Sequence, residues 1–189
     1  MSRERAASGP IEVRTPRLRL VALDAELARL QVEDRPAFFQ ALDAQVEAAW
    51  PPVPGEDHKM VEMLEILARH PDEAGWRGWV FMMGWAPGQP DRAVGTGGFF
   101  GPPDATGEIE IAYAMCPSFR EQGLATEAVG GLLDWAFTDP RVRTVRAVTQ
   151  AHLYASRRVL EKSGFSETED VGAGEDAIRY DLAREDRAA

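Results

Sequence analysis

The order of apolar patterns in the second half of the chain constrains the fold more than any other feature. An alternating run at residues 107–116 precedes a helical pattern over 124–138, and a second strand-like run follows at 142–150. Consecutive strands joined by a helical crossover lie parallel to each other, because tight turns connect only antiparallel strands. The pattern therefore predicts a mixed α/β fold with a strand–helix–strand unit in its middle.

Further strands and helices surround this unit. Residues 76–85 and 93–101 are strand-like and are separated by a turn-rich segment, which indicates a hairpin. Other strands are expected over 15–23 and 176–182, and helices over 24–30, 35–50, 56–69 and 154–165. The chain has no internal repeat and no linker that would separate domains. We therefore expect a flexible tail at residues 1–13 and a single domain at residues 14–184.

The charge balance bears on the partners of the protein. The 189 residues include 31 acidic and 21 basic side chains, which gives a formal net charge of −10. Nucleic-acid-binding proteins usually carry a basic excess, so we expect no nucleic-acid partner. The acidic balance is compatible with a cationic substrate, although many enzymes are acidic for solubility alone.

Several expected absences follow from residue usage. No apolar run approaches the ~18 residues of a membrane span, and no apolar stretch follows the charged N-terminal residues as it does in a signal peptide. The single cysteine, Cys116, rules out an internal disulfide and fits a reducing compartment. The histidines His58, His70 and His152 lie far apart in sequence. We expect a cytoplasmic protein with no membrane contact and no bound metal.

The stretch PSFREQGLATEAV, residues 117–129, opens the helix of the central unit. A helix N-terminus leaves four backbone N–H groups without intrahelical partners and carries about half a positive charge. Gly123 allows close backbone approach, Ala125 keeps the surface low, and Arg120 adds a cation. These features predict a phosphate site, while an ordinary glycine-containing loop remains the alternative from spacing alone. The P-loop and G-x-G-x-x-G signatures are absent.

Four motifs in this chain resemble those of the GNAT superfamily of N-acetyltransferases, and they occur in the family's order. REQGLA, residues 120–125, is similar to the R/Q-x-x-G-x-G/A signature. EIAY at 110–113 precedes it and ASRRVLEKSGF at 155–165 follows it. TPRLRL at 15–20 resembles the T-x-R-L-x-L opening of the branch that contains ribosomal-protein N-terminal acetyltransferases. The resemblance covers roughly residues 15–182.

This resemblance implies the GNAT acyl-CoA N-acyltransferase fold, a strongly twisted mixed sheet with flanking helices. Two neighbouring parallel strands splay apart in that fold, and acetyl-CoA enters the gap as the acetyl donor. By residue matching, the pyrophosphate would meet Arg120, Glu121, Gln122, Gly123, Leu124 and Ala125, with Thr126 at the edge. The pantetheine arm would run along Ala114, Met115 and Cys116. The resemblance also leaves a homodimer open.

The family's chemistry is direct attack of a neutral amine on the thioester. A free α-amino group has a pKa near 7.7, so an amine of this kind needs little help to become neutral. The resemblance implies that Glu110 is the base or amine-orienting group and that Ser156 protonates the leaving thiolate. The alternatives are an ordinary ion pair for Glu110 and a first-turn hydrogen bond for Ser156. Tyr113 is expected in the core.

Two departures from the family pattern keep other functions open. Leu153 stands where many relatives have an asparagine, and Leu160 stands where many have a tyrosine acid. An inactive module that binds acyl-CoA is therefore one alternative, and a transferase of a longer acyl group is another. The acceptor is an amine, either a small molecule or a protein N-terminus. Candidates to line its pocket are Trp50, Trp76, Trp79 and Trp85, and at least two of these are expected in the core.

Overall fold

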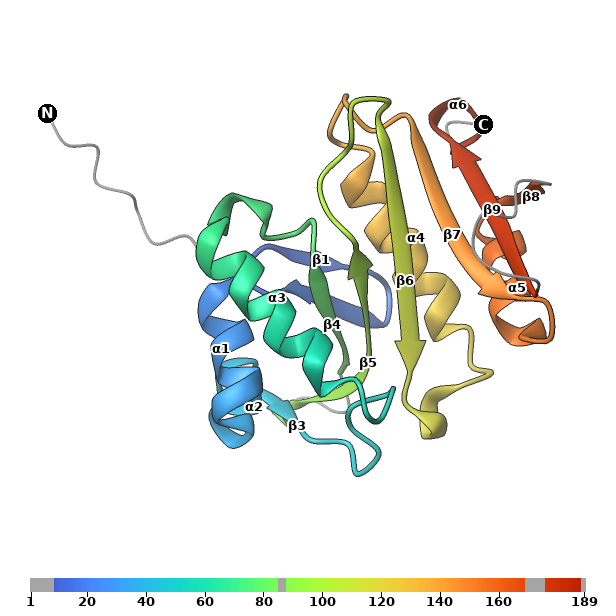
Figure 1. The fold of residues 1–189 in the computed structure, drawn as a ribbon. Coiled ribbons are helices and arrows are strands. Elements are labelled where there is room, and N and C mark those ends of the chain that lie inside the picture. The colour runs from blue at the N-terminus through green and yellow to red at the C-terminus, as the bar shows by residue number, and fades with distance from the viewer. Residues whose placement is uncertain (1–8, 85–87, 169–175, 188–189) are drawn as a thin grey trace, which may run out of the picture.

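The computed structural model describes residues 9–84, 88–168 and 176–187, and Figure 1 shows a single curved sheet flanked by helices. Its strands are β1 (Glu12–Arg14), β2 (Leu18–Ala22), β3 (Ala44–Gln45), β4 (Gly78–Met83), β5 (Asp91–Phe99), β6 (Glu108–Met115), β7 (Thr144–Gln150), β8 (Ser166–Thr168) and β9 (Ala177–Ala183). Its α-helices are α1 (Ala25–Glu33), α2 (Arg35–Ala41), α3 (Asp57–Arg69), α4 (Leu124–Ala136), α5 (Tyr154–Lys162) and α6 (Arg184–Arg187). None of these helices is long and apolar enough to cross a membrane.

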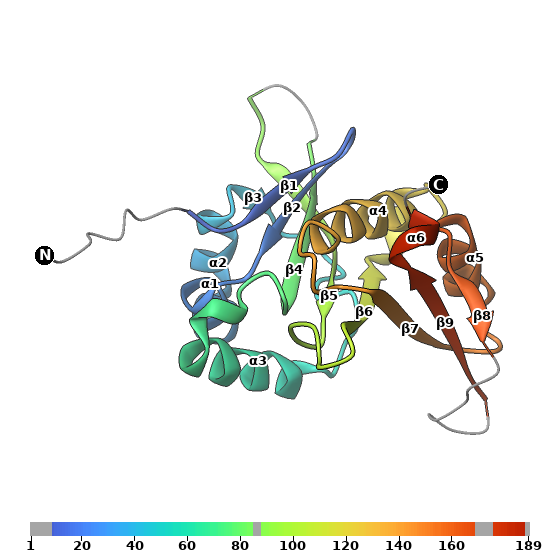
Figure 2. The same cartoon turned by 90° about the horizontal axis from the view of Figure 1, so that it is seen from above.

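The strand order confirms the mixed α/β prediction. The sheet runs β1-β2-β4-β5-β6-β7-β9-β8, and the short β3 pairs with β5. The β4–β5 hairpin is antiparallel, as predicted, while β6 and β7 are parallel and are joined by α4. In the view from above, α3 and α4 lie on opposite faces of the sheet (Figure 2). The central strand–helix–strand unit is therefore present, and its elements follow in the expected order β6, α4 and β7.

Strands β6 and β7 pair over only a short stretch. Their register joins Glu108 with Thr144, Ile109 with Val145, and Glu110 with Arg146. Strand β6 continues alongside β5 as far as Met115, and β7 continues alongside β9. The two parallel strands therefore separate beyond the third pair, as the splayed arrangement requires.

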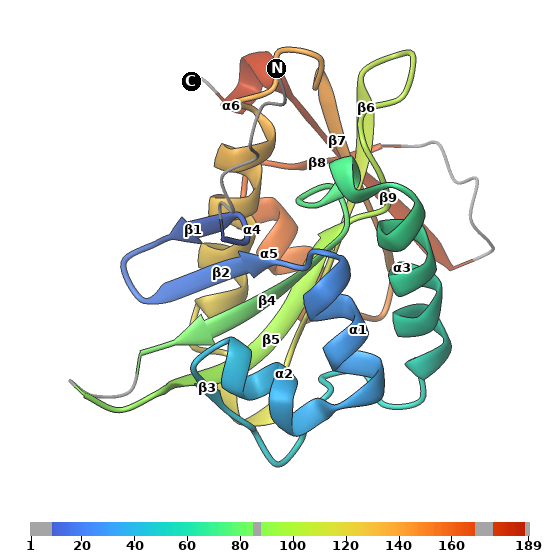
Figure 3. The ribbon, with the colours of Figure 1, turned by 90° about the vertical axis from the view of Figure 1, so that its left-hand side faces the viewer.

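Helix α4 packs closely on the N-terminal hairpin because one of its residues has no side chain. A Cβ atom placed on Gly131 would lie 2.9 Å from both Leu20 Cδ1 and Thr15 Cγ2. The neighbouring Gly130 faces another way, and the nearest atom to a Cβ there is 4.0 Å away. Figure 3 shows the β1–β2 hairpin beside α4. Gly131 thus sets the distance between the helix and β2.

The predicted helix over residues 35–50 is too long. Helix α2 starts as expected, where the Asp34 side chain accepts a hydrogen bond from Ala37 N at 3.0 Å. The chain turns at Asp43, whose φ of 49° is left-handed and tolerated by aspartate. Residues 44–45 then form β3, because pairing with β5 outweighs the helical periodicity.

Smaller differences lie at the two ends of the chain. Residues 12–14 form β1 and pair with β2, so ordered structure begins inside the segment expected to be a tail. Strand β8 and the short α6 were not expected. Of the expected tail, residues 1–8 lie outside the described residues, as does Trp85.

The two glycines of α4 give a matched test of this packing. We expect Gly131→Ala to destabilise the fold by about 1–3 kcal/mol, because the added methyl overlaps Leu20 and Thr15. Gly130→Ala should stabilise it by about 0.5–1 kcal/mol, because alanine restricts the unfolded chain and meets open space. Urea unfolding of both variants and the parent measures these differences, and equal effects at the two positions would contradict the packing.

Candidate active site

The loop between β6 and α4 leaves the helix N-terminus bare. It contains a single turn of 3₁₀ helix at Pro117–Phe119, and then Glu121 and Gly123 adopt left-handed φ values of 60° and 75°. Gly123 is the N-cap residue, and no side chain caps the helix there. No side chain of the described residues therefore caps the first N–H groups of α4, which leaves them available to an anion.

A carboxylate ties this helix to the N-terminal hairpin. Glu127, in the first turn of α4, accepts hydrogen bonds from Thr15 Oγ1 at 2.6 Å and from Arg17 N at 2.7 Å. Its other oxygen accepts from Arg17 Nε at 2.6 Å. Burial raises the pKa of Glu127, but these hydrogen bonds outweigh burial and hold the pKa below its ordinary value. Glu127 is therefore ionised and fixed at neutral pH.

Arg17 brings a second cation to the anion site, beside Arg120. Its Nη1 donates to Gln122 O at 2.9 Å, and its Nη2 lies 3.5 Å from a Cβ placed on Gly123. Sequence reasoning did not assign Arg17 to the site. The signal was present in the TPRLRL motif, but the sequence does not show that this motif lies against residues more than 100 positions later.

Beyond residue 110, β6 has no strand partner among the described residues on the side of the gap beside β7. On the opposite side, Cys116 N donates to Val94 O at 2.9 Å, and Phe100 N donates to Glu110 O at 3.1 Å. Even-numbered residues of β6 therefore direct their backbone groups to β5. Since successive residues alternate, the odd-numbered ones beyond residue 110 direct theirs into the gap.

This alternation changes which strand residues suit the pantetheine arm. Tyr113 and Met115 present backbone groups to the gap, and Arg120 Nε donates to Met115 O at 3.1 Å. Ala114 is an even-numbered residue, so its backbone groups face β5. Cys116 is buried, both of its backbone groups are already hydrogen-bonded, and burial raises the pKa of its thiol to about 11. Of the three expected contacts, the geometry favours Met115.

The two glutamates of β6 have different surroundings. Both side chains lie on one face of the strand, as expected. Glu108 forms ion pairs with Arg146 and, at 3.0 Å, with Arg179 Nη2. Glu110 forms no ion pair or side-chain hydrogen bond with any described residue. The ordinary ion pair considered for Glu110 is thus found at Glu108, and the Glu110 carboxylate is left available for chemistry.

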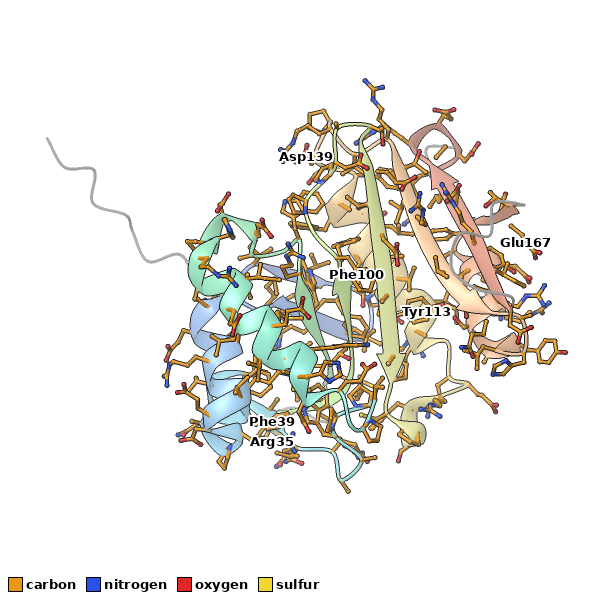
Figure 4. The ribbon with its side chains drawn as sticks, in the orientation of Figure 1. Arg35, Phe39, Phe100, Tyr113, Asp139 and Glu167 are labelled. Atoms are coloured by element: carbon orange, nitrogen blue, oxygen red, sulfur yellow. The ribbon has the colours of Figure 1, made fainter. Side chains whose placement is uncertain are left out.

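Ser156 on α5 is held by a residue of β6. Tyr113 Oη donates to Ser156 O at 3.1 Å and lies 3.3 Å from Ser156 Oγ. Burial raises the pKa of Tyr113 to about 12, so the phenol is protonated at neutral pH. Figure 4 shows Tyr113 projecting from β6 on the side of α5. Tyr113 packs against the core, as expected, but its hydroxyl contact with Ser156 was missed.

A cavity of about 510 Å³ opens on the face of the sheet covered by α3. It reaches Ala112, Tyr113 and Ala114 of β6, and Glu110 lies on the same strand face two residues before Ala112. Of the tryptophans considered for an acceptor pocket, Trp50, Trp76 and Trp79 are all buried in the core, and Trp79 also borders this cavity.

The remaining residues around the start of α5 differ in how they contact the rest of the protein. Leu153 occupies the N-cap position and is 44% exposed. Tyr154 is exposed, and Arg157 is held by Tyr180 Oη at 3.1 Å and by Glu167. Of these, Arg157 stabilises the packing of α5 on β9.

Comparison with known proteins adds relatives of this chain. The N-acetyltransferase YjdG of Bacillus subtilis (strain 168), which is described as uncharacterized, is 29% identical over 157 residues, covering 80% of this chain and 87% of YjdG. The ribosomal-protein-S5-alanine acetyltransferase from Vibrio fischeri has a TM-score of 0.60 and 15% identity, covering 93% of this chain and 98% of that one. A spermidine N-acetyltransferase chimera from Vibrio cholerae and hSSAT has a TM-score of 0.62 and 16% identity, covering 91% and 98%.

These solved structures show the fold, which agrees with the resemblance carried by the four motifs. The family itself is shown by a family model described as acetyltransferase (GNAT) domain, which matches residues 25–166. That match spans well over half of the chain and includes β6, the loop between β6 and α4, and α5. This protein therefore belongs to the GNAT family of N-acetyltransferases.

Proposed function

We propose that the protein transfers an acetyl group from acetyl-CoA to a primary amine by direct attack. The observation that carries this proposal is the open edge of β6, which runs from the free Glu110 carboxylate to the bare N-terminus of α4. An extended ligand with an anionic end fits this arrangement. Its extended part would pair with the edge of β6, and its anionic end would meet the N-terminus of α4.

The donor is held mainly by backbone groups. The N–H groups at the start of α4 receive the pyrophosphate, and Gly123 leaves room for it. The guanidinium of Arg120 adds positive charge, and that of Arg17, which is paired with Glu127, lies beside Gly123. Backbone groups of Tyr113 and Met115 pair with the arm. The remaining proposed phosphate contacts are Glu121, Gln122, Leu124, Ala125 and Thr126.

The catalytic roles follow from the free groups around the gap. Glu110 accepts a proton from the amine, directly or through a water, as the new C–N bond forms. The C–S bond breaks, Ser156 Oγ–H gives a proton to the departing sulfur and takes one back from solvent, and Glu110 releases the amine's proton to solvent. Tyr113 fixes Ser156 by donating to its carbonyl and contacting its hydroxyl. Leu153 supplies no polar group, so acid chemistry rests on the Ser156–Tyr113 pair.

A matched pair of substitutions tests the role of Glu110. We expect Glu110→Gln to lower kcat/KM at pH 7 by roughly 10²-fold, because general-base catalysis contributes about 10²–10⁴. The deficit should shrink as pH rises, since more of the amine is then neutral without help. Thiol release measured from pH 6 to pH 9 gives both quantities.

The control for this test is Glu108→Gln, two residues away on the same strand face. This variant loses two ion pairs, so its unfolding midpoint should fall while its pH profile keeps the parent's shape. Identical pH profiles for all three proteins would show that Glu110 is not the base.

A second pair of substitutions tests the acid. Ser156→Ala should lower kcat by roughly 10-fold to 10²-fold while leaving acetyl-CoA affinity unchanged, because the hydroxyl acts only on the leaving group. Tyr113→Phe should lower kcat less, since Ser156 remains but is no longer fixed. Single-turnover kinetics with calorimetric titration separates these effects. A loss of affinity with unchanged kcat in Ser156→Ala would place Ser156 in binding instead.

The same measurements address the two alternatives. Acetyl-CoA binding without thiol release across many amines would indicate a binding module, and faster turnover of a longer acyl-CoA would change the donor. The acceptors named for the similar structures, a ribosomal protein and spermidine, differ in size and charge, so neither is adopted for this chain.

A further inference from the structure

We infer that Glu47 is a positioning residue that couples the loop between β6 and α4 to one wall of the cavity on the α3 face of the sheet. This inference rests on the proposed function, because that loop is proposed to receive acetyl-CoA. It is carried by the contacts of a buried carboxylate with two elements of the site, and by the small number of other contacts that hold the cavity wall.

One wall of the cavity belongs to residues 46–55, which connect β3 with α3 and are here called the connecting segment. Three of its residues line the cavity: Pro51, Pro52 and Val53. The structure describes the whole segment, and three of its residues are buried: Glu47, Trp50 and Pro52. The other residues are exposed or only half-buried, so the position of this wall depends on few anchors.

Glu47 is the polar anchor of the connecting segment. It is only 8% exposed, and its carboxylate forms an ion pair with Arg92 of β5. Its Oε1 also accepts a hydrogen bond from Ser118 Oγ at 3.4 Å. Burying a carboxylate is unfavourable unless partners hydrogen-bond it. The position of Glu47 is therefore tied to the positions of Arg92 and Ser118.

Both partners of Glu47 lead to the same turn of the β6–α4 loop. Ser118 lies in the 3₁₀ turn of this loop, and Arg92 Cζ lies 4.7 Å from the ring centroid of Phe119 in the same turn. Gln122 Nε2 donates to Ser118 O at 2.9 Å, which links the turn to the residues just before α4. Two routes thus join Glu47 to the part of the loop that is proposed to meet the pyrophosphate. The connecting segment and this loop lie side by side (Figures 1 and 3).

The thiol at the end of β6 shows that Glu47 lies close to the proposed donor site. Burial raises the pKa of Cys116 to about 11, and the charge of the Glu47 carboxylate adds to the rise. The charge of Arg120, which is proposed to meet the pyrophosphate, acts on the same thiol in the opposite direction. Glu47 and Arg120 therefore both lie near the end of β6.

Trp50 is the aromatic anchor of the connecting segment, and it is weaker than its burial suggests. The residue is 7% exposed, and its ring packs edge-on against Phe39 with the centroids 5.4 Å apart. Its Nε1 has no hydrogen-bond partner among the described residues. An unpaired buried N–H offsets part of the stabilisation that comes from burying the ring. The segment therefore depends on Glu47 for its position.

A ligand that fixes the β6–α4 loop would also fix the cavity wall. Binding of the pyrophosphate restricts the loop, and Ser118 and Arg92 then restrict Glu47. The turn from Glu47 to Trp50 is closed by a hydrogen bond from Trp50 N to Glu47 O at 3.0 Å, and it continues directly into Pro51. Coupling of this kind is reciprocal, so a fixed wall also favours donor binding.

Hydrogen–deuterium exchange with and without saturating acetyl-CoA tests this coupling and needs neither an acceptor nor turnover. In the parent, we expect acetyl-CoA to slow amide exchange in the β6–α4 loop and, by roughly tenfold, in the connecting segment. Glu47→Met keeps the side-chain length and removes both contacts. In this variant exchange in the loop should still slow, while exchange in the segment should change by less than about twofold.

Ser118 offers a pair of variants that leaves Glu47 in place, and its exposure makes both easy to accommodate. Ser118→Ala should reduce the tenfold slowing in the segment to roughly threefold, because the route through Arg92 remains. Ser118→Thr keeps the hydroxyl and should behave as the parent. Asp91→Asn is the matched control, because it weakens an ion pair with Arg19 beside Arg92 but lies outside both routes. It should keep the full slowing.

The outcomes separate this inference from the proposed function. Slower exchange in the loop but not in the segment of the parent would overturn the inference and leave the proposed function intact. Equal slowing of the segment in the parent, Glu47→Met and Ser118→Ala would also overturn it, as would loss of the slowing in Asp91→Asn. If Glu47→Met does not fold, the two Ser118 variants decide. Unchanged exchange in both regions of the parent would mean that acetyl-CoA does not bind, and the proposed function would then fail together with the inference.

Discussion

The short pairing between β6 and β7 is the constraint on which the rest of the structure depends. Each strand keeps a full antiparallel partner on its other side, β5 for β6 and β9 for β7, so the two can separate without leaving the sheet. Glu108 closes the paired end through Arg146 and Arg179. At the other end β6 has no strand partner on the β7 side among the described residues, although Met115 O accepts from Arg120 Nε, and an open strand edge favours an extended ligand. Where β6 separates from β7, the chain continues into the loop that precedes α4.

The N-terminal hairpin supports this arrangement from a distance in sequence. Gly131 lets β2 lie close to α4, and Glu127 then reaches Thr15 and Arg17. Arg17 in turn holds the peptide before Gly123. The T-x-R-L motif precedes the segment matched by the family model, yet it contacts the loop proposed to bind phosphate. The charge of Arg17 is paired with that of Glu127, so the groups left to meet an anion here are mainly those of the backbone.

The sequence predicted the central unit because alternation and helical periodicity are strong over residues 107–150. It failed at residues 42–50, where a helical spacing of apolar residues continues although the chain has already turned at Asp43. The prediction that Ala114, Met115 and Cys116 line the arm stays a prediction, and side-chain alternation in the sequence does not show which neighbouring strand each backbone group faces. The contacts of Tyr113 with Ser156 join distant segments that no local pattern connects.

The central claim is that the N-terminus of α4 receives the pyrophosphate, and calorimetric titration of acetyl-CoA tests it most directly. Gly123→Glu adds bulk and negative charge at this position, and Gly88→Glu makes the same change at a comparable φ of 78° in the loop between β4 and β5, where a Cβ meets no atom within 4 Å. We expect the parent and Gly88→Glu to bind with equal affinity, and Gly123→Glu to bind at least ~100-fold more weakly, since like charges in contact repel strongly. Equal binding by all three folded proteins, or none by the parent, would contradict the account.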